Sequence, residues 1–157
     1  MLRFVVLIGG IFVSTTGFSA SEQAQQLAEK YLIADTHIDL PFRLERMYED
    51  ATRRTQMGQF DYPRAIEGGL NVPFMSIYIP AKYEEEGGGK DFANLLIDRV
   101  EALVGRAPEK YSIPHSTSDV YQDQQKGLVS LAMGMENGTP LEGDLDNLGY
   151  FHGRGIR

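Results

Sequence analysis

The sequence predicts an α/β fold in which parallel strands alternate with amphipathic helices. Three observations predict it. Apolar stretches rich in β-branched and aromatic residues recur, as in 70–79 (LNVPFMSIYI). A helical apolar stripe runs through 91–104, and glycine or proline separates the two kinds of segment. The alternation gives about three complete strand–helix units and the first residues of a fourth strand.

The N-terminal elements are expected to be a helix, a short strand and a second helix. The first helix covers 21–32 and begins with a Ser-x-x-Glu capping box. The apolar stretch 31–34 then leads into a strand that ends in DTHID. Pro41 opens a second helix that extends to about residue 51, because proline is well tolerated in a first helical turn.

The middle of the chain is expected to contain a helix, a buried strand and a loop. The helix covers 62–67 and is stopped by the two glycines that follow. The strand covers 70–79, and Pro73 within it argues that regular pairing starts late. The segment 82–89 (KYEEEGGG) is expected to be a solvated loop.

The clearest helix is 91–104, because its apolar residues recur at helical spacing. They are Phe92, Leu95, Leu96, Val100, Leu103 and Val104. The remaining predicted elements are a helix over 118–126, a strand over 128–135, a helix from Thr139 towards Phe151 and the start of a strand at 155–157.

The composition excludes several classes of site and partner. Fifteen Lys and Arg against 22 Asp and Glu give a net charge of −7 without any basic run, so we expect no nucleic-acid partner. The absence of cysteine excludes disulfides, Cys-ligated zinc, iron–sulfur clusters and thiol nucleophiles. A metal site must therefore use carboxylates and the three histidines.

Residues 1–20 have the layout of a secretory signal peptide. Arg3 precedes an apolar run over 4–13, and small polar residues follow. The run is too short to span a bilayer, which needs roughly 20 apolar residues. Cleavage near Ala20 would leave 21–157 as an exported domain, periplasmic or extracellular. The alternative is an uncleaved leader that attaches the protein to a membrane.

Two strand ends carry residues suited to metal binding. His37 and Asp39 are two residues apart at the end of the first strand, so their side chains project to the same side. Glu136 follows the apolar run 128–135, where a buried carboxylate would need a nearby cation. Barrel enzymes place their sites at such carboxyl ends. The alternatives are a chance His-x-Asp pair and a loop carboxylate that faces water.

These motifs resemble those of the membrane dipeptidase family, also called renal dipeptidase-like. The resemblance rests on DTHIDLP (35–41), EGGLNVPFMSIYIP (67–80), LAMGMENG (131–138) and FHGRGIR (151–157), which occur in the family's order. The family commonly has glycine where this chain has Asn137. This departure leaves the carboxylate of Glu136 in place.

The resemblance implies the N-terminal part of a (β/α)8 TIM-type barrel, truncated after about three to four βα units. It also implies a two-zinc centre that hydrolyses dipeptides with a metal-activated water. By position, His37 and Asp39 would bind one Zn²⁺ ion. Glu136 would bridge both ions and would serve catalysis by setting their separation. The remaining ligands would come from strands beyond residue 157.

We therefore expect 21–157 to be the N-terminal half of a longer enzyme, and the 157 residues alone to be inactive on dipeptides. His115 and His152 are expected to be surface or packing residues. The expected partners are a dipeptide substrate, a membrane where the leader stays uncleaved, and a second copy of the chain in a homodimer. The alternative is a non-catalytic metal-binding or interaction module of the same fold that needs a protein partner.

Overall fold

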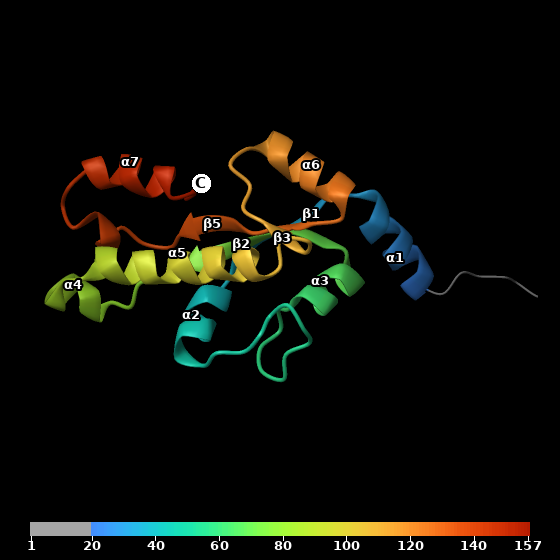
Figure 1. The fold of residues 1–157 in the computed structure, drawn as a ribbon, viewed down its shortest axis with the longest axis horizontal. Helices are drawn as coiled ribbons and strands as arrows, with labels where there is room; N and C mark the ends of the chain where they lie inside the picture. Colours follow the sequence, from blue (N-terminus) through green and yellow to red (C-terminus); the bar gives the residue numbers. More distant parts are fainter. Residues whose placement is uncertain (1–19) are drawn as a thin grey trace, which may run out of the picture.

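The computed structural model describes residues 20–157, which form a parallel sheet with helices packed around it (Figure 1). The sheet has three strands in the order β1 (Ile33–Ile38), β2 (Leu70–Ile77) and β5 (Ala132–Met135). Both pairings are parallel. An isolated parallel bridge between Met133 and Ile156 adds the start of a further strand. The predicted α/β fold with parallel strands is confirmed.

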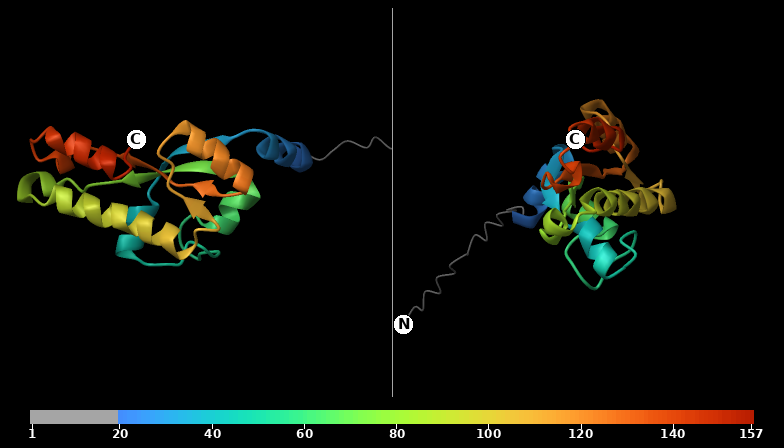
Figure 2. Two further views of the ribbon diagram at one scale, coloured as in Figure 1. Left: turned by 45° about the horizontal axis from the view of Figure 1, so that its top comes forward. Right: turned by 90° about the vertical axis from the view of Figure 1, so that its left-hand side faces the viewer.

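Helices follow the strands along the chain. They are α1 (Ala20–Lys30), α2 (Leu40–Arg46), α3 (Tyr62–Gly68), α4 (Lys82–Glu86), α5 (Gly89–Arg106), α6 (Thr117–Lys126), the 3₁₀ turn η1 (Thr139–Leu141) and α7 (Asp146–Gly153). Helices α2, α3, α5 and α6 contact β2, and α6 and α7 lie along the upper side in Figure 1. The left view of Figure 2 shows α5, in yellow, running along one side of the strands. Between residues 20 and 157, no helix has both the length and the apolar character needed to cross a membrane.

The predicted leader lies outside the described residues except for Ala20, with which α1 begins. Its capping serine, Ser19, also lies outside them. The first predicted helix is therefore present as α1, but it ends two residues earlier than expected, at Lys30.

The hydrophobic core lies between one face of β2 and helix α5. Met75 and Ile77 of β2, and Ile79 just past its end, alternate along the chain and are at most 1% exposed. Leu96 and Ile97 of α5 are fully buried in the same cluster. Burial of each such side chain stabilises the fold by about 1.5–3 kcal/mol. This packing fixes β2 and leaves the opposite face of the strand for other contacts.

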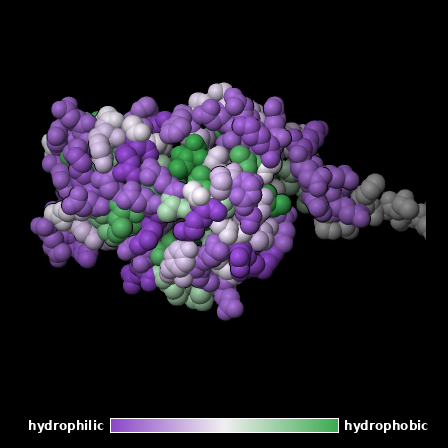
Figure 3. Space-filling view, viewed as in Figure 1, coloured by the Kyte–Doolittle hydropathy of each residue, from purple (hydrophilic) through white to green (hydrophobic). Residues whose placement is uncertain are grey.

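That opposite face is lined by smaller or half-buried residues. Val72, Phe74 and Ala132 line an apolar cavity of about 430 Å³ together with Val120 and Tyr121 of α6. Figure 3 shows hydrophobic residues reaching the surface between α6 and α7. The sheet therefore buries one face fully and the other only in part.

Three predicted helices are confirmed, and their ends have identifiable causes. The carboxylate of Asp61 accepts the Arg64 N–H at the start of α3, and Gly69 ends the helix at a left-handed φ of 71°. Ser116 caps the start of α6 in the same way, and Gly127 ends that helix in a left-handed conformation. Helix α5 extends beyond the predicted 91–104 at both ends.

The helix expected from Pro41 to residue 51 is too long. Helix α2 ends at Arg46, and Met47 is extended. The carboxylate of Glu49 accepts backbone N–H groups from Gln56 and Met57, which makes the chain turn back where the helix would have continued. A side chain that bonds backbone several residues ahead competes with the helical ladder.

The loop and late strand start expected between 70 and 89 are also wrong in part. Residues 82–86 form the short helix α4, in which Tyr83 stacks on Phe92 with ring centroids 4.8 Å apart. Strand β2 begins at Leu70, so Pro73 lies inside it. The β1–β2 register is irregular beside Pro73, which accommodates the missing N–H.

The last third differs from the prediction at two places. The expected strand 128–135 is divided into β4 (Val129–Ser130), which pairs with the unpredicted β3 (Tyr111–Ser112), and β5, which pairs with β2. The strand changes partners at Leu131, whose N–H still donates to the Ser112 carbonyl. The expected helix from Thr139 is divided into η1 and α7, because Glu142 takes a left-handed φ of 51°.

Candidate metal centre

Three potential ligands come from three elements that meet at the carboxyl end of the sheet. His37 lies next to the end of β1, Asp39 immediately precedes α2, and Glu136 directly follows β5. Strands β1 and β5 flank β2 in parallel, so their carboxyl ends share one edge. Ile38 packs against the core, and this places its strand neighbour His37 on the other side of β1.

The side chains of these residues converge. His37 Nε2 lies 3.3 Å from Asp39 Oδ1 and 3.5 Å from Glu136 Oε2. One ligand atom from each residue lies within 4.8 Å of the others. The side chains are 53%, 61% and 36% exposed, so solvent reaches all three. The structure thus brings together the three residues singled out in the sequence, and their role as ligands stays a prediction.

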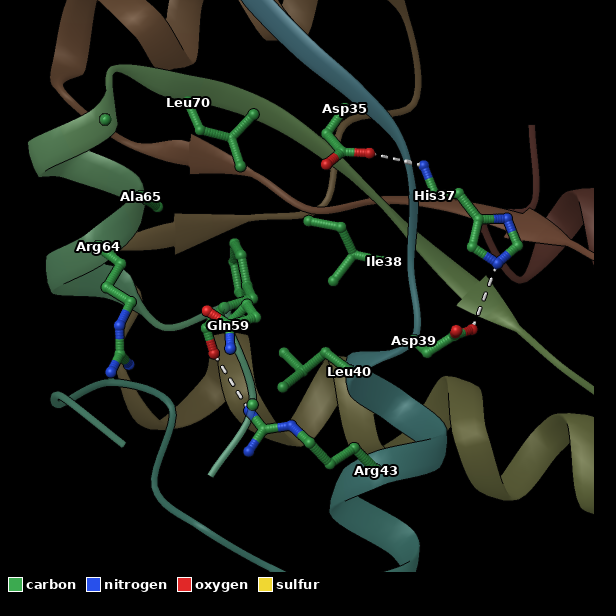
Figure 4. A pocket seen from close by; sticks show the side chains of 13 residues that line it. Asp35, His37, Ile38, Asp39, Leu40, Arg43, Gln59, Arg64, Ala65 and Leu70 are labelled. Atoms are coloured by element: carbon green, nitrogen blue, oxygen red, sulfur yellow. Dashed lines mark hydrogen bonds and ion pairs between the residues drawn. The ribbon is translucent and has the colours of Figure 1, made fainter. Parts of the chain in front are cut away.

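Asp39 reaches His37 by a route that alternation along a strand does not describe. It occupies the N-cap position of α2 with φ −80° and ψ 30°, outside β1. Its side chain makes no capping hydrogen bond to the helix. The carboxylate instead turns towards the imidazole of His37 (Figure 4).

Two neighbouring residues hold the potential ligands in place. The Asp35 carboxylate accepts the backbone N–H of His37 at 3.0 Å, in a stretch where the β1–β2 register is irregular. Ser76 of β2 donates its hydroxyl to Glu136 Oε2 at 2.8 Å and is 4% exposed. Ser76 was not among the residues predicted from sequence. A signal existed, because it is the one serine in the apolar stretch 70–79 and lies between Met75 and Ile77, on the opposite face of the strand.

A cavity of about 520 Å³ opens beside the site (Figure 4). His37 and Asp39 line one side of it, and Leu40 and Leu70 add apolar surface. The guanidinium of Arg43 at its margin is already bonded to Glu49 and to backbone carbonyls. Two of the three potential ligands, His37 and Asp39, therefore border a recess with the volume of a small-molecule site.

The donor set fits a divalent transition metal. An imidazole nitrogen with carboxylate oxygens is a ligand combination that Zn²⁺ accepts. Three protein ligands with open positions are typical of catalytic rather than structural zinc sites. A cation would also offset the repulsion between the neighbouring carboxylates of Asp39 and Glu136. These residues supply enough ligands for one ion.

The other two histidines lie elsewhere. His115 Nδ1 lies 3.1 Å from Arg157 Nη2, and its carbonyl also accepts from that arginine. His152 is exposed on α7. Among residues 20–157, the His37, Asp39 and Glu136 cluster is the group of three or more such side chains with metal-binding spacing.

Comparison with known proteins gives a consistent family match. The family model of Membrane dipeptidase (Peptidase family M19) matches residues 21–157. The chain is 24% identical over 147 residues to Dipeptidase ataJ of Aspergillus terreus, which covers 86% of this chain and 36% of the relative. It is 26% identical over 141 residues to Dipeptidase 3 of Mus musculus, covering 87% and 28% respectively. The chain thus spans about a third of the length of these curated relatives.

Solved structures share the fold. The dipeptidase AC structure matches with a TM-score of 0.70 and 26% identity, over 80% of this chain and 41% of that one. The probable dipeptidase PvdM of Pseudomonas aeruginosa matches with a TM-score of 0.74 and 23% identity, over 87% of this chain and 36% of that one. A third match is a metallo peptidase of Rhodobacter sphaeroides liganded with a phosphinate mimic of the dipeptide L-Ala-D-Ala. Its TM-score is 0.70 and its identity 22%, over 80% of this chain and 44% of that one. The predicted N-terminal part of a TIM-type barrel is confirmed by these neighbours.

Proposed function

Because the chain belongs to the membrane dipeptidase family, peptidase family M19, we propose that the protein is a zinc-dependent dipeptidase. A metal cofactor is expected of this metallopeptidase family. The proposal adds that the metal is zinc and that the complete centre holds two ions. Since the chain spans only part of its relatives, the activity is proposed for the whole polypeptide.

One observation carries the proposal. An imidazole and two carboxylates, brought from three elements up to 99 residues apart, converge within 4.8 Å at the carboxyl end of a parallel sheet. Sites of barrel enzymes are built at this end of the strands. Nearby exposed carboxylates repel one another unless a cation lies between them. The arrangement is therefore better suited to holding an ion than to stabilising the fold.

Each residue of the chain has a distinct proposed part. His37 and Asp39 would hold one zinc ion, while Glu136 would hold the same ion and reach the second. Bound zinc supplies Lewis acidity and lowers the pKa of water towards neutrality. Glu136 would act in catalysis by setting the separation of the ions, and Asp35 would keep the backbone of His37 in register. The open recess beside His37 leaves room for a small substrate.

The proposed substrate class is the dipeptide, and the reaction is hydrolysis of its peptide bond. The family match supports this class, as does the Rhodobacter sphaeroides neighbour, which is liganded with a dipeptide mimic. Residues 1–157 alone are proposed to be inactive, because the described residues supply three ligands, enough for one ion only.

The location and assembly are proposed from the sequence. The N-terminal leader supports export to a periplasmic or extracellular space, and retention of the leader would attach the protein to a membrane. A homodimer is the proposed assembly. The net charge of −7 supports the absence of a nucleic-acid partner.

The function is tested on the whole polypeptide that the gene encodes. We expect the purified protein to hydrolyse L-Ala-D-Ala or L-Ala-L-Ala in the presence of zinc, and His37→Ala to abolish turnover. His115→Ala is the matched control, because His115 is also exposed to solvent but lies outside the ligand cluster. Zinc binding without hydrolysis of any dipeptide would favour the non-catalytic metal-binding module instead.

A further inference from the structure

Strand β2 contacts Glu136 in two ways. The Ser76 hydroxyl donates to Glu136 Oε2 at 2.8 Å, and the Ile77 carbonyl accepts the Glu136 backbone N–H at 3.3 Å. Ser76 is paired in register with Gly134 of β5, two residues before Glu136.

The burial of Ser76 is accounted for by this contact. Its neighbours in the strand, Met75 and Ile77, are fully buried apolar residues, and Ser76 itself is 4% exposed. A buried hydroxyl without a partner is destabilising. Ser76 satisfies its hydroxyl on the same oxygen, Oε2, that faces His37 Nε2. The serine therefore orients the carboxylate towards the histidine.

Asn137 fixes the backbone on the other side of Glu136. Its amide Nδ2 donates to the Ile79 carbonyl, just past the end of β2, at 2.9 Å. Its Oδ1 accepts the Thr139 N–H at 3.2 Å, where η1 begins. Asn137 is not among the described residues with a positive φ, so its backbone conformation does not require glycine. The amide ties the turn after β5 to the end of β2.

We propose that Ser76 and Asn137 are positioning residues for Glu136, and we call the pair the β2 clamp. Ser76 sets the rotation of the carboxylate, and Asn137 sets the place of the backbone that carries it. The inference rests on the proposed metal centre. Outer groups that orient a ligand typically change metal affinity by 10–100-fold when they are removed.

The test compares zinc affinity in matched pairs of variants. Isothermal titration calorimetry with Zn²⁺ is run on the whole apo polypeptide, and circular dichroism checks the fold. Ser76→Ala is paired with Ser130→Ala, because Ser130 is also a buried β-strand serine that donates to a carboxylate, Asp123, at 2.8 Å. Asn137→Ala is paired with Asn71→Ala, which removes a 2.8 Å bond to the Ile33 N–H at the opposite end of β2.

The clamp predicts a loss confined to the site. We expect Ser76→Ala to weaken zinc binding by about tenfold. Asn137→Ala should weaken it by about threefold, since it acts through the backbone and removes ordinary neutral hydrogen bonds. Both controls should bind zinc as the wild type does, even where they unfold more easily.

Two outcomes would overturn the clamp. One is wild-type zinc affinity in both Ser76→Ala and Asn137→Ala. The other is an equal loss in test and control variants, which would mean that any weakening of the sheet is enough. If Ser76→Ala fails to fold, Asn137→Ala still tests the clamp, because Asn137 is only half-buried. A wild type that binds zinc but cleaves no dipeptide would contradict the proposed function and leave this affinity comparison standing.

Discussion

The strand-end carboxylates and the interior carboxylates of this chain are held in different ways. Glu136 and Asp39 are 36% and 61% exposed, and Glu136 accepts the hydroxyl of Ser76. Asp123, 7% exposed, accepts from the hydroxyls of both Ser112 and Ser130. Asp61, fully buried, accepts from Thr55 and Arg64.

The difference separates carboxylates that stabilise the fold from those that are available to an ion. Asp61 receives two backbone N–H groups, a hydroxyl and a guanidinium, so the chain itself satisfies its charge. Asp39 and Glu136 face an imidazole and solvent, and their charges lie next to each other. Water satisfies these two exposed carboxylates, and a cation bound between them would relieve their mutual repulsion. The comparison therefore predicts opposite effects of substitution in the two groups.

The largest expected effect is on stability, at Asp61. Asp61→Ala removes the acceptor for the Thr55 and Arg64 N–H groups and leaves the Arg64 guanidinium without its buried partner. We expect a loss of about 3 kcal/mol in the free energy of unfolding, the lower end for breaking a buried pair because Arg64 is partly hydrated. Urea unfolding of the apo protein measures it, and zinc affinity should stay unchanged.

The matched control for Asp61→Ala is Asp98→Ala. Asp98 also pairs with an arginine, Arg154, but its side chain is 63% exposed. An exposed ion pair contributes about 0–1 kcal/mol, so this variant should unfold almost as the wild type does. Equal losses in the two variants would contradict the distinction drawn between buried and exposed carboxylates.

The next effect is on metal affinity, at Asp39. Asp39→Asn removes a proposed ligand charge, and we expect zinc affinity to fall by about a hundredfold, at least the upper end of the loss seen for supporting groups. Its stability without metal should be unchanged within about 0.5 kcal/mol, because Asp39 makes no capping hydrogen bond in α2. Calorimetry measures the zinc affinity, and urea unfolding measures the stability without metal. Asp98→Asn is the control for loss of a charge. A stability loss without an affinity loss would place Asp39 among the interior carboxylates.

Much of the fold could be predicted because its signals are local. The apolar stripe of α5 and the alternation that buries Met75 and Ile77 are visible in short windows of sequence. The placement of His37 and Glu136 followed from the same reasoning, since each comes at the end of an apolar stretch. Helix α2 was overestimated because its end depends on Glu49, whose carboxylate bonds the backbone of Gln56 and Met57.

The missed features depend on partners that are distant in sequence. Ser76 lies 60 residues from Glu136, so nothing near it in the sequence shows which carboxylate its hydroxyl meets. The division of 128–135 into β4 and β5 depends on β3, a two-residue strand too short for any periodic signal. Asp39 was correctly placed near His37, but a helix start rather than strand alternation brings it there.

The smallest effect, and the one that tests the interior group most directly, is the pH dependence of stability at Asp61. Burial by itself raises the pKa of Asp61. Hydrogen bonds from the Arg64 and Thr55 backbone N–H groups and the Thr55 hydroxyl, together with the Arg64 charge, outweigh burial and hold the pKa below its usual value. A carboxylate with a lowered folded pKa binds protons more weakly folded than unfolded. Its stabilising contribution is therefore complete above the unfolded pKa and is lost as the pH falls through the folded pKa.

Asp61→Asn should remove this part of the acid sensitivity. The difference in unfolding free energy between the wild type and Asp61→Asn should be constant from neutral pH to about pH 5 and should shrink below about pH 4. Other carboxylates with lowered pKa values, such as Asp50 and Asp119, are present in both proteins and cancel in the difference. Urea unfolding of the apo proteins at several pH values measures it, since acid would also release any metal. A difference that stays constant down to about pH 3 would mean that Asp61 is not stabilised as a carboxylate, and the contrast with Glu136 would then rest on exposure alone.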